Sequence, residues 1–124
     1  MSPVWDIELE PEVAKWLETL APNEFAIVAF HIDRLADLGA TLRMPHSRSL
    51  GEGLFELRFD YGHTTQRITF FFGSKDRRIV LLTVFRKQRM NERAEVTRAR
   101  AAMERCIAEK HETSEKGEIK DDDE

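Results

Sequence analysis

The middle of this 124-residue sequence is rich in arginine, a side chain well suited to binding phosphate. Residues 41–108 hold fourteen basic and seven acidic residues, and twelve of the basic ones are arginine. A guanidinium stays charged at every relevant pH, and its planar fork donates two hydrogen bonds at once to a phosphate. The balance is −6 over residues 1–40 and −5 over residues 109–124, so the net charge of −4 conceals a basic centre. Such a centre is typical of a polyanion site, and equally of a solvated, ion-paired surface.

Two histidines, His46 and His63, fall in this basic region and could carry protons, because histidine titrates near neutral pH. His46 lies in an arginine-rich loop, whereas His63 falls in a turn, where a solvated turn residue is the simpler interpretation. His31 lies beside the apolar stripe of a helix, which favours packing. No spacing of His, Cys, Asp and Glu is typical of a metal site, and a single cysteine, Cys106, excludes an internal disulfide. We therefore expect neither a metal nor a cofactor.

The first forty residues predict a strand and a helical hairpin. Residues 4–9 alternate between apolar and acidic side chains, as a strand with one wet face does. Pro11 suits the first turn of a helix, and apolar residues then recur at helical spacing up to Leu20. A second helix, which Asn23 can cap, continues to Gly39, and this glycine is placed to end it.

Three strands at hairpin spacing follow an irregular segment, residues 41–53. Residues 55–61 alternate between apolar and charged side chains, residues 67–72 alternate and then become apolar, and residues 79–85 are almost wholly apolar. The last of these runs must lie centrally in the sheet, where both of its faces are covered. A final helix, which Asn91 can cap, follows a basic junction.

This order of elements predicts one α+β domain over residues 1–108, with an antiparallel sheet of about four strands, the N-terminal helical hairpin on one face and a C-terminal helix. The opposite face would present Glu56, Arg58 and Arg67 to solvent. The acid-rich residues 109–124 predict a disordered tail. The sequence has no N-terminal signal pattern and no apolar run near the ~20 residues of a membrane helix. Together with the single thiol, this favours a cytoplasmic protein.

Three short motifs carry a resemblance to a known family. They are residues 53–58 (GLFELR), the pair Arg67-Ile68 and the run from Val80 to Lys87, and a basic helix follows them. In this order, on a chain of this length, they resemble toxins of the RelE/ParE type. More narrowly they resemble the HigB-like, phage Gp49-related branch of bacterial type II toxin–antitoxin systems. The resemblance covers the element order over about residues 4–108.

The resemblance implies a RelE-like fold and a metal-independent endoribonuclease. Many members of the family cleave mRNA on the ribosome, which inhibits translation, and a cognate helix-turn-helix antitoxin holds them inactive. Two alternatives stay open, because a fold does not settle an activity. ParE-like relatives inhibit DNA gyrase without enzymatic activity, and a catalytically inactive relative would only bind its antitoxin.

In RNA cleavage without a metal, the substrate's 2′-hydroxyl attacks the phosphate, so fixed cations must stabilise the charge that develops. Arg67 matches the family's arginine that opens the strand after the turn, and Arg86 and Lys87 match a basic pair after the central strand. We expect these three to be catalytic, with His46 as a proton carrier. Arg67 could instead pair with an acidic residue of the neighbouring strand.

Five further arginines are expected to contact RNA. Glu56 lies two residues before one of them, Arg58, on the same face of a strand, so this pair could equally support the sheet or hold the antitoxin. The sequence departs from the family near the last helix, because residues 97–108 contain neither the tyrosine nor the histidine that the family often places there. The five predicted RNA contacts are Arg43, Arg48, Arg58, Arg89 and Arg93.

Overall fold

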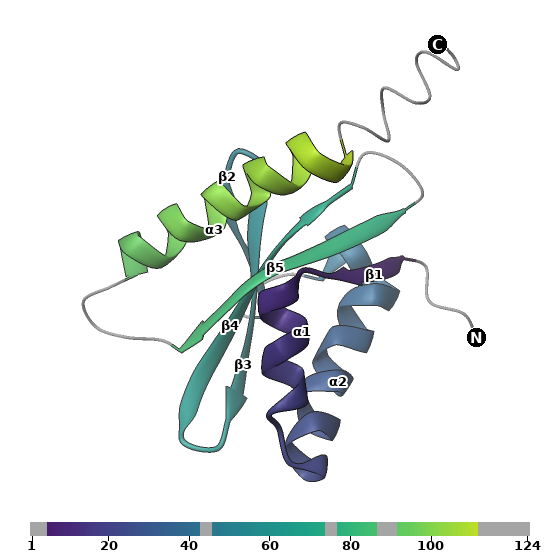
Figure 1. The fold of residues 1–124 in the computed structure, drawn as a ribbon. Coiled ribbons are helices and arrows are strands. Elements are labelled where there is room, and N and C mark those ends of the chain that lie inside the picture. The colour runs from purple at the N-terminus through teal and green to yellow at the C-terminus, as the bar shows by residue number, and fades with distance from the viewer. Residues whose placement is uncertain (1–4, 43–45, 74–76, 87–91, 112–124) are drawn as a thin grey trace.

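A computed structural model describes residues 5–42, 46–73, 77–86 and 92–111, and Figure 1 shows its fold. Within these residues the structure confirms the predicted α+β class, because helices and strands both occur and form separate layers (Figure 1). In chain order the elements are β1 (Asp6–Leu9), α1 (Pro11–Glu18), α2 (Pro22–Leu38), a 3-10 turn (Gly39–Thr41), β2 (Ser47–Gly51), β3 (Leu54–Tyr61), β4 (Thr64–Phe72), β5 (Arg78–Arg86), α3 (Glu92–Cys106) and a π-helical turn (Ile107–His111).

The strands form one five-stranded sheet in the order β1-β5-β4-β3-β2. β1 pairs with β5 in parallel, and the other neighbours are antiparallel. The prediction of about four antiparallel strands is therefore corrected at both edges of the sheet: β1 is parallel to its neighbour, and β2 is an additional strand. β2 forms inside the segment predicted to be irregular, because its sequence, SRSLG, lacks the apolar alternation that marks a strand. The central position predicted for residues 79–85 is confirmed, since β5 lies between β1 and β4 and residues 79–83 are buried.

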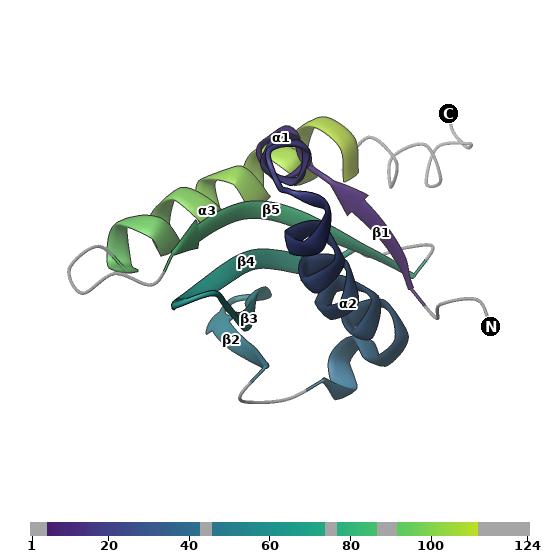
Figure 2. The ribbon, with the colours of Figure 1, turned by 90° about the horizontal axis from the view of Figure 1, so that it is seen from below.

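Both faces of this sheet are covered, as Figure 2 shows. The α1–α2 hairpin packs on one face over a core that includes Leu57, Phe59, Ile68 and Phe70. α3 packs on the other face, where Ala99 and other small or flexible side chains meet the sheet. The members of this second core are Leu54, Phe71, Val80, Leu82, Ala99, Ala102, Met103 and Cys106.

The strand pleat explains why charged residues lie between the sheet and α3. Side chains of a strand alternate between its two faces. In β3, Leu57 and Phe59 face the helical hairpin, so Glu56 and Arg58 face α3. The prediction that these charges lie on an open face is wrong, because α3 folds over that face.

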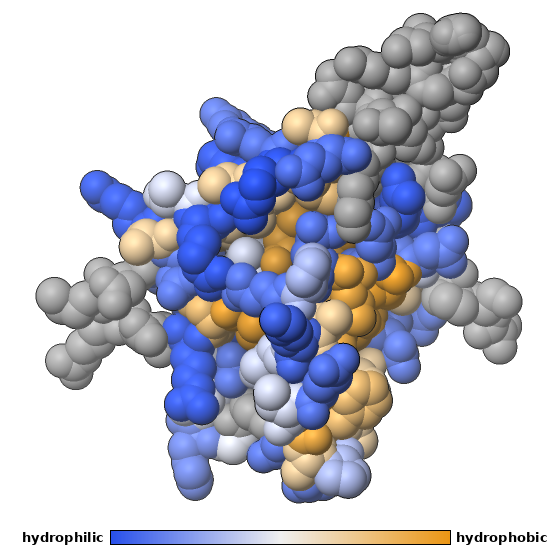
Figure 3. Space-filling model, in the orientation of Figure 1, coloured by the Kyte–Doolittle hydropathy of each residue, from blue (hydrophilic) through white to orange (hydrophobic). Residues whose placement is uncertain are grey.

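The surface seen in Figure 3 is largely polar along α3, with apolar side chains showing between α3 and the helical hairpin. Among the described residues, no helix combines the length and apolar character that a membrane crossing requires.

The cap predicted at Asn23 is wrong, because α2 begins at Pro22 and the Ala21 N–H donates instead to the Glu24 carboxylate, at 2.8 Å. Of the predicted tail, residues 112–124 lie outside the described residues, as does Asn91.

Gly39 ends α2 as predicted, with φ 51° and ψ −129°, a combination that favours glycine. Replacing it with alanine is expected to lower the free energy of unfolding by about 1–3 kcal/mol. The added methyl group would meet both the positive φ and the indole of Trp5, which occupies that space. Urea unfolding followed by circular dichroism measures the change.

The matched control for Gly39 is Gly62→Ala. Gly62 also has a positive φ, 64°, but its surroundings are open, so only the backbone cost of about 1 kcal/mol remains. Equal losses of stability in the two variants would contradict the role assigned to the Trp5 contact.

Candidate functional site

Five charged side chains gather between the sheet and the first turn of α3. Cross-strand partners share one face of a sheet, and the register places Arg48 of β2 opposite Glu56, and Arg58 of β3 opposite Arg67 of β4. Glu92, the first residue of α3, joins them from above. We call these five residues the arginine–glutamate cluster. It brings together three of the arginines that the sequence predicted to bind RNA or phosphate.

Glu56 is the centre of the cluster and is fully buried. Its Oε2 lies 3.0 Å from Nη2 of Arg48, and its Oε1 lies 3.4 Å from Nη1 of Arg67. Nε of Arg58 is 3.7 Å from Oε2. A carboxylate is costly to bury unless cations compensate its charge. Here three neighbouring strands supply them.

Glu92 connects the cluster to α3. Its Oε2 accepts a hydrogen bond from Nη2 of Arg48 at 2.8 Å and lies 2.9 Å from Nη1 of Arg67. The bonds from Arg48 and then Arg67 hold the pKa of Glu92 below its ordinary value of 4.5, against a smaller opposing effect of burial. The first turn of α3 is therefore attached to β2 and β4 through one carboxylate.

The sequence led us to expect Arg67 on a solvent-exposed face of the sheet, but the structure buries it. Its side chain is only 3% exposed and lies between Glu56 and Glu92. Its guanidinium carbon is 5.8 Å from the centre of the Phe85 ring. The alternation of β4 predicted the correct face, but not that α3 covers it. The structure therefore contains the alternative arrangement, in which Arg67 pairs with Glu56 of the neighbouring strand. The catalytic role of Arg67 stays a prediction.

The cluster has more hydrogen-bond donors than its carboxylates satisfy. Within the described part of the chain, Nε of Arg48, Arg58 and Arg67 and Oε2 of Glu56 are buried without a hydrogen-bond partner. Oε2 has two cations close to it, but not in hydrogen-bonding orientation. Three positive charges face two negative ones, and buried unsatisfied donors are rare in native proteins. The cluster therefore carries a net positive charge.

The other predicted cations lie apart from this cluster. Arg86 is exposed at the end of β5 and pairs in register with Gln66, whereas Arg67 pairs with Phe85. Arg86 therefore starts from the opposite face of the sheet to Arg67. Arg93 is exposed in the first turn of α3. Three predicted residues lie outside the described residues: Lys87, Arg43 and Arg89.

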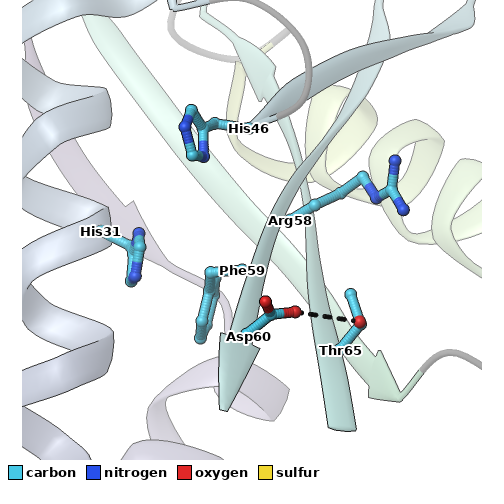
Figure 4. A pocket seen from close by; sticks show the side chains of 6 residues that line it. All are labelled: His31, His46, Arg58, Phe59, Asp60 and Thr65. Carbon is cyan, nitrogen blue, oxygen red and sulfur yellow. Dashed lines mark hydrogen bonds between the residues drawn. The ribbon is translucent and has the colours of Figure 1, made fainter.

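His46 lies in a hollow of about 310 Å³ at the edge of β3, shown in Figure 4. β2 begins only at Ser47, and the N–H of Arg58 donates to the His46 carbonyl at 2.8 Å. Figure 4 shows the rings of His31 and His46 directed towards a common space, and the Arg58 guanidinium pointing away from them. The lining residues are His31, His46, Arg58, Phe59, Asp60 and Thr65. The described residues contain no group of three or more His, Cys, Asp or Glu that could hold a metal.

His31 combines the predicted packing role with a place in this hollow. Its ring stacks on Phe59, with centroids 4.7 Å apart and planes 13° apart, and Phe30 meets it edge-on. Burial, followed by the positive charges of His46 and Arg34, lowers the pKa of His31 below 6.5, against an opposing effect of Asp60. The imidazole is therefore neutral at pH 7. The sequence could not place it beside His46, because the fold alone brings these residues together.

Replacing Glu92 with glutamine is expected to lower the free energy of unfolding at pH 7 by about 1 kcal/mol, a figure reduced for its partial exposure. Because the pKa of Glu92 is depressed in the folded state, its contribution is complete above 4.5 and is lost as the pH falls through the folded-state value. The difference from the unaltered protein should thus shrink at pH 3. Urea unfolding at both pH values measures it.

Glu104, exposed on the same helix, provides the control. Glu104→Gln is expected to leave stability unchanged at both pH values. A Glu92→Gln difference that is equally large at pH 3 and pH 7 would contradict the ionic role of Glu92.

Comparison with known proteins assigns this chain to a family. The family model described as "Phage derived protein Gp49-like (DUF891)" matches residues 15–106. No curated protein matches the sequence. A mutant of the E. coli toxin RelE in the free state is similar at 10% identity and a TM-score of 0.58, over 82% of this chain and 97% of that chain. The toxin–antitoxin complex RelBE2 from Mycobacterium tuberculosis is similar at 19% identity and a TM-score of 0.51, over 69% of this chain and 100% of that chain.

The family match runs from within α1 to the end of α3, so it includes the whole arginine–glutamate cluster. At these identities the two solved structures show the fold, which is that of the RelE toxins. Both findings confirm the family resemblance that the motifs of the sequence predicted. The chain belongs to the Gp49-like family of phage-derived proteins.

Proposed function

We propose that this protein is the toxin of a type II toxin–antitoxin pair and that it cleaves mRNA without a metal. Its Gp49-like family and its RelE fold support the toxin role. The observation that carries the ribonuclease role is the arginine–glutamate cluster, in which cations from three adjacent strands converge with donors to spare.

The Glu92 carboxylate shows how a phosphate would bind. Its Oε2 lies within 3 Å of guanidinium nitrogens of both Arg48 and Arg67. A phosphate oxygen makes the same charge-assisted contacts. We assign the scissile phosphate to this position, with Arg58 beside it, so that RNA displaces Glu92. The Glu92 side chain is 42% exposed, and α3 is anchored further along by Ala99 and Met103. The carboxylate can therefore leave without opening that core.

The arginines then stabilise charge in the reaction. The 2′-oxygen of the RNA loses its proton and attacks the adjacent phosphorus, and the 5′-oxygen leaves with a proton, which yields a 2′,3′-cyclic phosphate and a 5′-hydroxyl. Negative charge builds on the phosphoryl oxygens in the transition state, and fixed donors there lower the barrier. Arg86, Lys87 and His46 are assigned to contacts with the RNA beyond this phosphate.

The partners follow from the same proposal. A helix-turn-helix antitoxin would hold the toxin inactive, and the similarity to the RelBE2 complex, whose name records a toxin bound to its antitoxin, supports such a partner. The substrate would be mRNA on the ribosome in the cytoplasm, so that cleavage inhibits translation.

Expression of the chain alone in a bacterial host tests the proposal. We expect growth arrest and new 5′-hydroxyl ends in cellular mRNA, and we expect the purified protein to cleave RNA in the presence of EDTA. Co-expression with the antitoxin encoded beside it should prevent both. Growth arrest with intact mRNA would overturn the ribonuclease role in favour of a gyrase inhibitor. Neither arrest nor cleavage would indicate the inactive relative.

A further inference from the structure

The hollow at the edge of β3 has flat walls and polar edges. The ring of His31 is fixed by its stack on Phe59, and the ring of His46 faces the same space (Figure 4). Asp60 and Thr65, hydrogen-bonded to each other at 3.2 Å, also line it, and the ring nitrogens of His31 and His46 supply polar groups. A ligand that fits such a site is planar and carries hydrogen-bonding groups on its edge.

An exposed aromatic side chain lies beside this hollow. Phe30 is 58% exposed on α2 and contacts the ring of His31 edge-on, with centroids 5.2 Å apart. A large exposed phenylalanine has no role in either core. Aromatic side chains at the surface are the platforms on which single-stranded nucleic acids stack their bases.

The lowered pKa of His31 suits the hollow to an uncharged ligand. His31 is neutral at pH 7, so its imidazole presents one donor and one acceptor instead of a positive charge. Burial is the largest cause of the lowered pKa, followed by His46 and Arg34, and Asp60 opposes it. The edge of a nucleobase offers both donors and acceptors, which match this imidazole.

The position of the hollow relates it to the arginine–glutamate cluster. Arg58 belongs to both, because it lines the hollow while its guanidinium points away from His31 and His46 (Figure 4), and its Nε lies 3.7 Å from Oε2 of Glu56. An RNA strand that crosses the edge of β3 at Arg58 would have a phosphate on one side and a base on the other.

We propose that this hollow binds an unstacked nucleobase of the RNA, next to the phosphate held by the cluster. The inference rests on the proposed function for its substrate class, and it adds a base-recognition site formed by His31 and His46. It assigns the specificity of cleavage to residues of α2 and β3 and to His46.

Uncharged nucleosides test this site without requiring cleavage. Adenosine, guanosine, cytidine and uridine are added in turn to the full-length protein, and the histidine ring protons are followed by NMR. We expect the His31 and His46 signals to shift saturably with at least one nucleoside, at a Kd on the order of 1–10 mM, as stacking of one base allows. The signals of His63, in the β3–β4 turn, should stay unchanged.

Two variants and one salt complete the experiment. His46→Ala is expected to weaken nucleoside binding at least fivefold, and His63→Ala to leave it unchanged. Inorganic phosphate should not shift the His31 and His46 signals. Absence of a shift with all four nucleosides overturns the inference, as does a response to phosphate alone. Because nucleosides contain no phosphate, nucleoside binding without RNA cleavage would refute only the proposed function, and cleavage without nucleoside binding only this inference.

Discussion

Glu56→Gln is expected to lower the free energy of unfolding by about 3–5 kcal/mol. Glutamine keeps the shape of the side chain but removes the charge that compensates Arg67, which is 3% exposed. In this variant Glu92 is the remaining carboxylate beside Arg67, so most of the free energy needed to desolvate the buried guanidinium is no longer compensated. Urea unfolding at pH 7, followed by fluorescence and circular dichroism, measures the loss.

Two further variants separate the charge effect from a general disturbance of the fold. Glu52→Gln, whose side chain is 84% exposed in its ion pair with Arg100, is expected to change stability by less than about 0.5 kcal/mol. The double variant Glu56→Gln/Arg67→Met removes both buried charges, so it should regain stability relative to Glu56→Gln alone. A Glu56→Gln protein as stable as the unaltered chain would show that the cluster is not what anchors β2, β3 and β4 to one another.

The second large effect concerns activity: Arg67→Lys is expected to reduce the rate of RNA cleavage by about 10²–10³-fold. Lysine retains a positive charge for Glu56, so the fold should be preserved. It lacks the planar fork that can bond the carboxylate of Glu56 and a phosphate oxygen at the same time. The loss should therefore appear in the rate of the chemical step, measured with a defined RNA at saturating concentration.

Arg98→Lys is the matched control for this activity. Arg98 is also paired with two glutamates, Glu12 at 2.5 Å and Glu95 at 2.8 Å, but it lies further along α3, outside the cluster. Its substitution is expected to leave cleavage within about twofold. If Arg67→Lys cleaved RNA as fast as the unaltered protein, Arg67 would be a structural residue only. If it stopped growth without cutting RNA, the target would be another molecule, such as gyrase.

Local periodicity was sufficient to predict much of this fold. The alternation of residues 55–61 placed Leu57 and Phe59 in the core, and Glu56 and Arg58 on the other face, as the structure confirms. The continuous apolar run of residues 79–85 identified an interior strand, because only a strand covered on both faces can bury side chains on both. These features depend on neighbours in the sequence, so they can be derived from it.

The parts that could not be predicted depend on long-range contacts. Nothing in the sequence SRSLG indicates a strand, since β2 owes its existence to pairing with β3. The burial of Arg67 depends on Glu92, and therefore on where α3 folds back, which no local pattern specifies. The same holds for the hollow, where His31 on α2 meets His46 before β2. In each case residue types were visible in the sequence, but their neighbours were not.

The parallel pairing of β1 has a consequence for how the protein is made. Asp6 pairs with Arg78 and Leu9 with Leu81, so the first strand to be synthesised must await β5, the last strand of the sheet. At about 5–20 residues per second, this delay lasts roughly 4–15 s for each nascent chain. Glu92, the residue that completes the cluster, is translated later still. The sheet that carries the cluster is thus expected to be complete only when most of the chain has been synthesised.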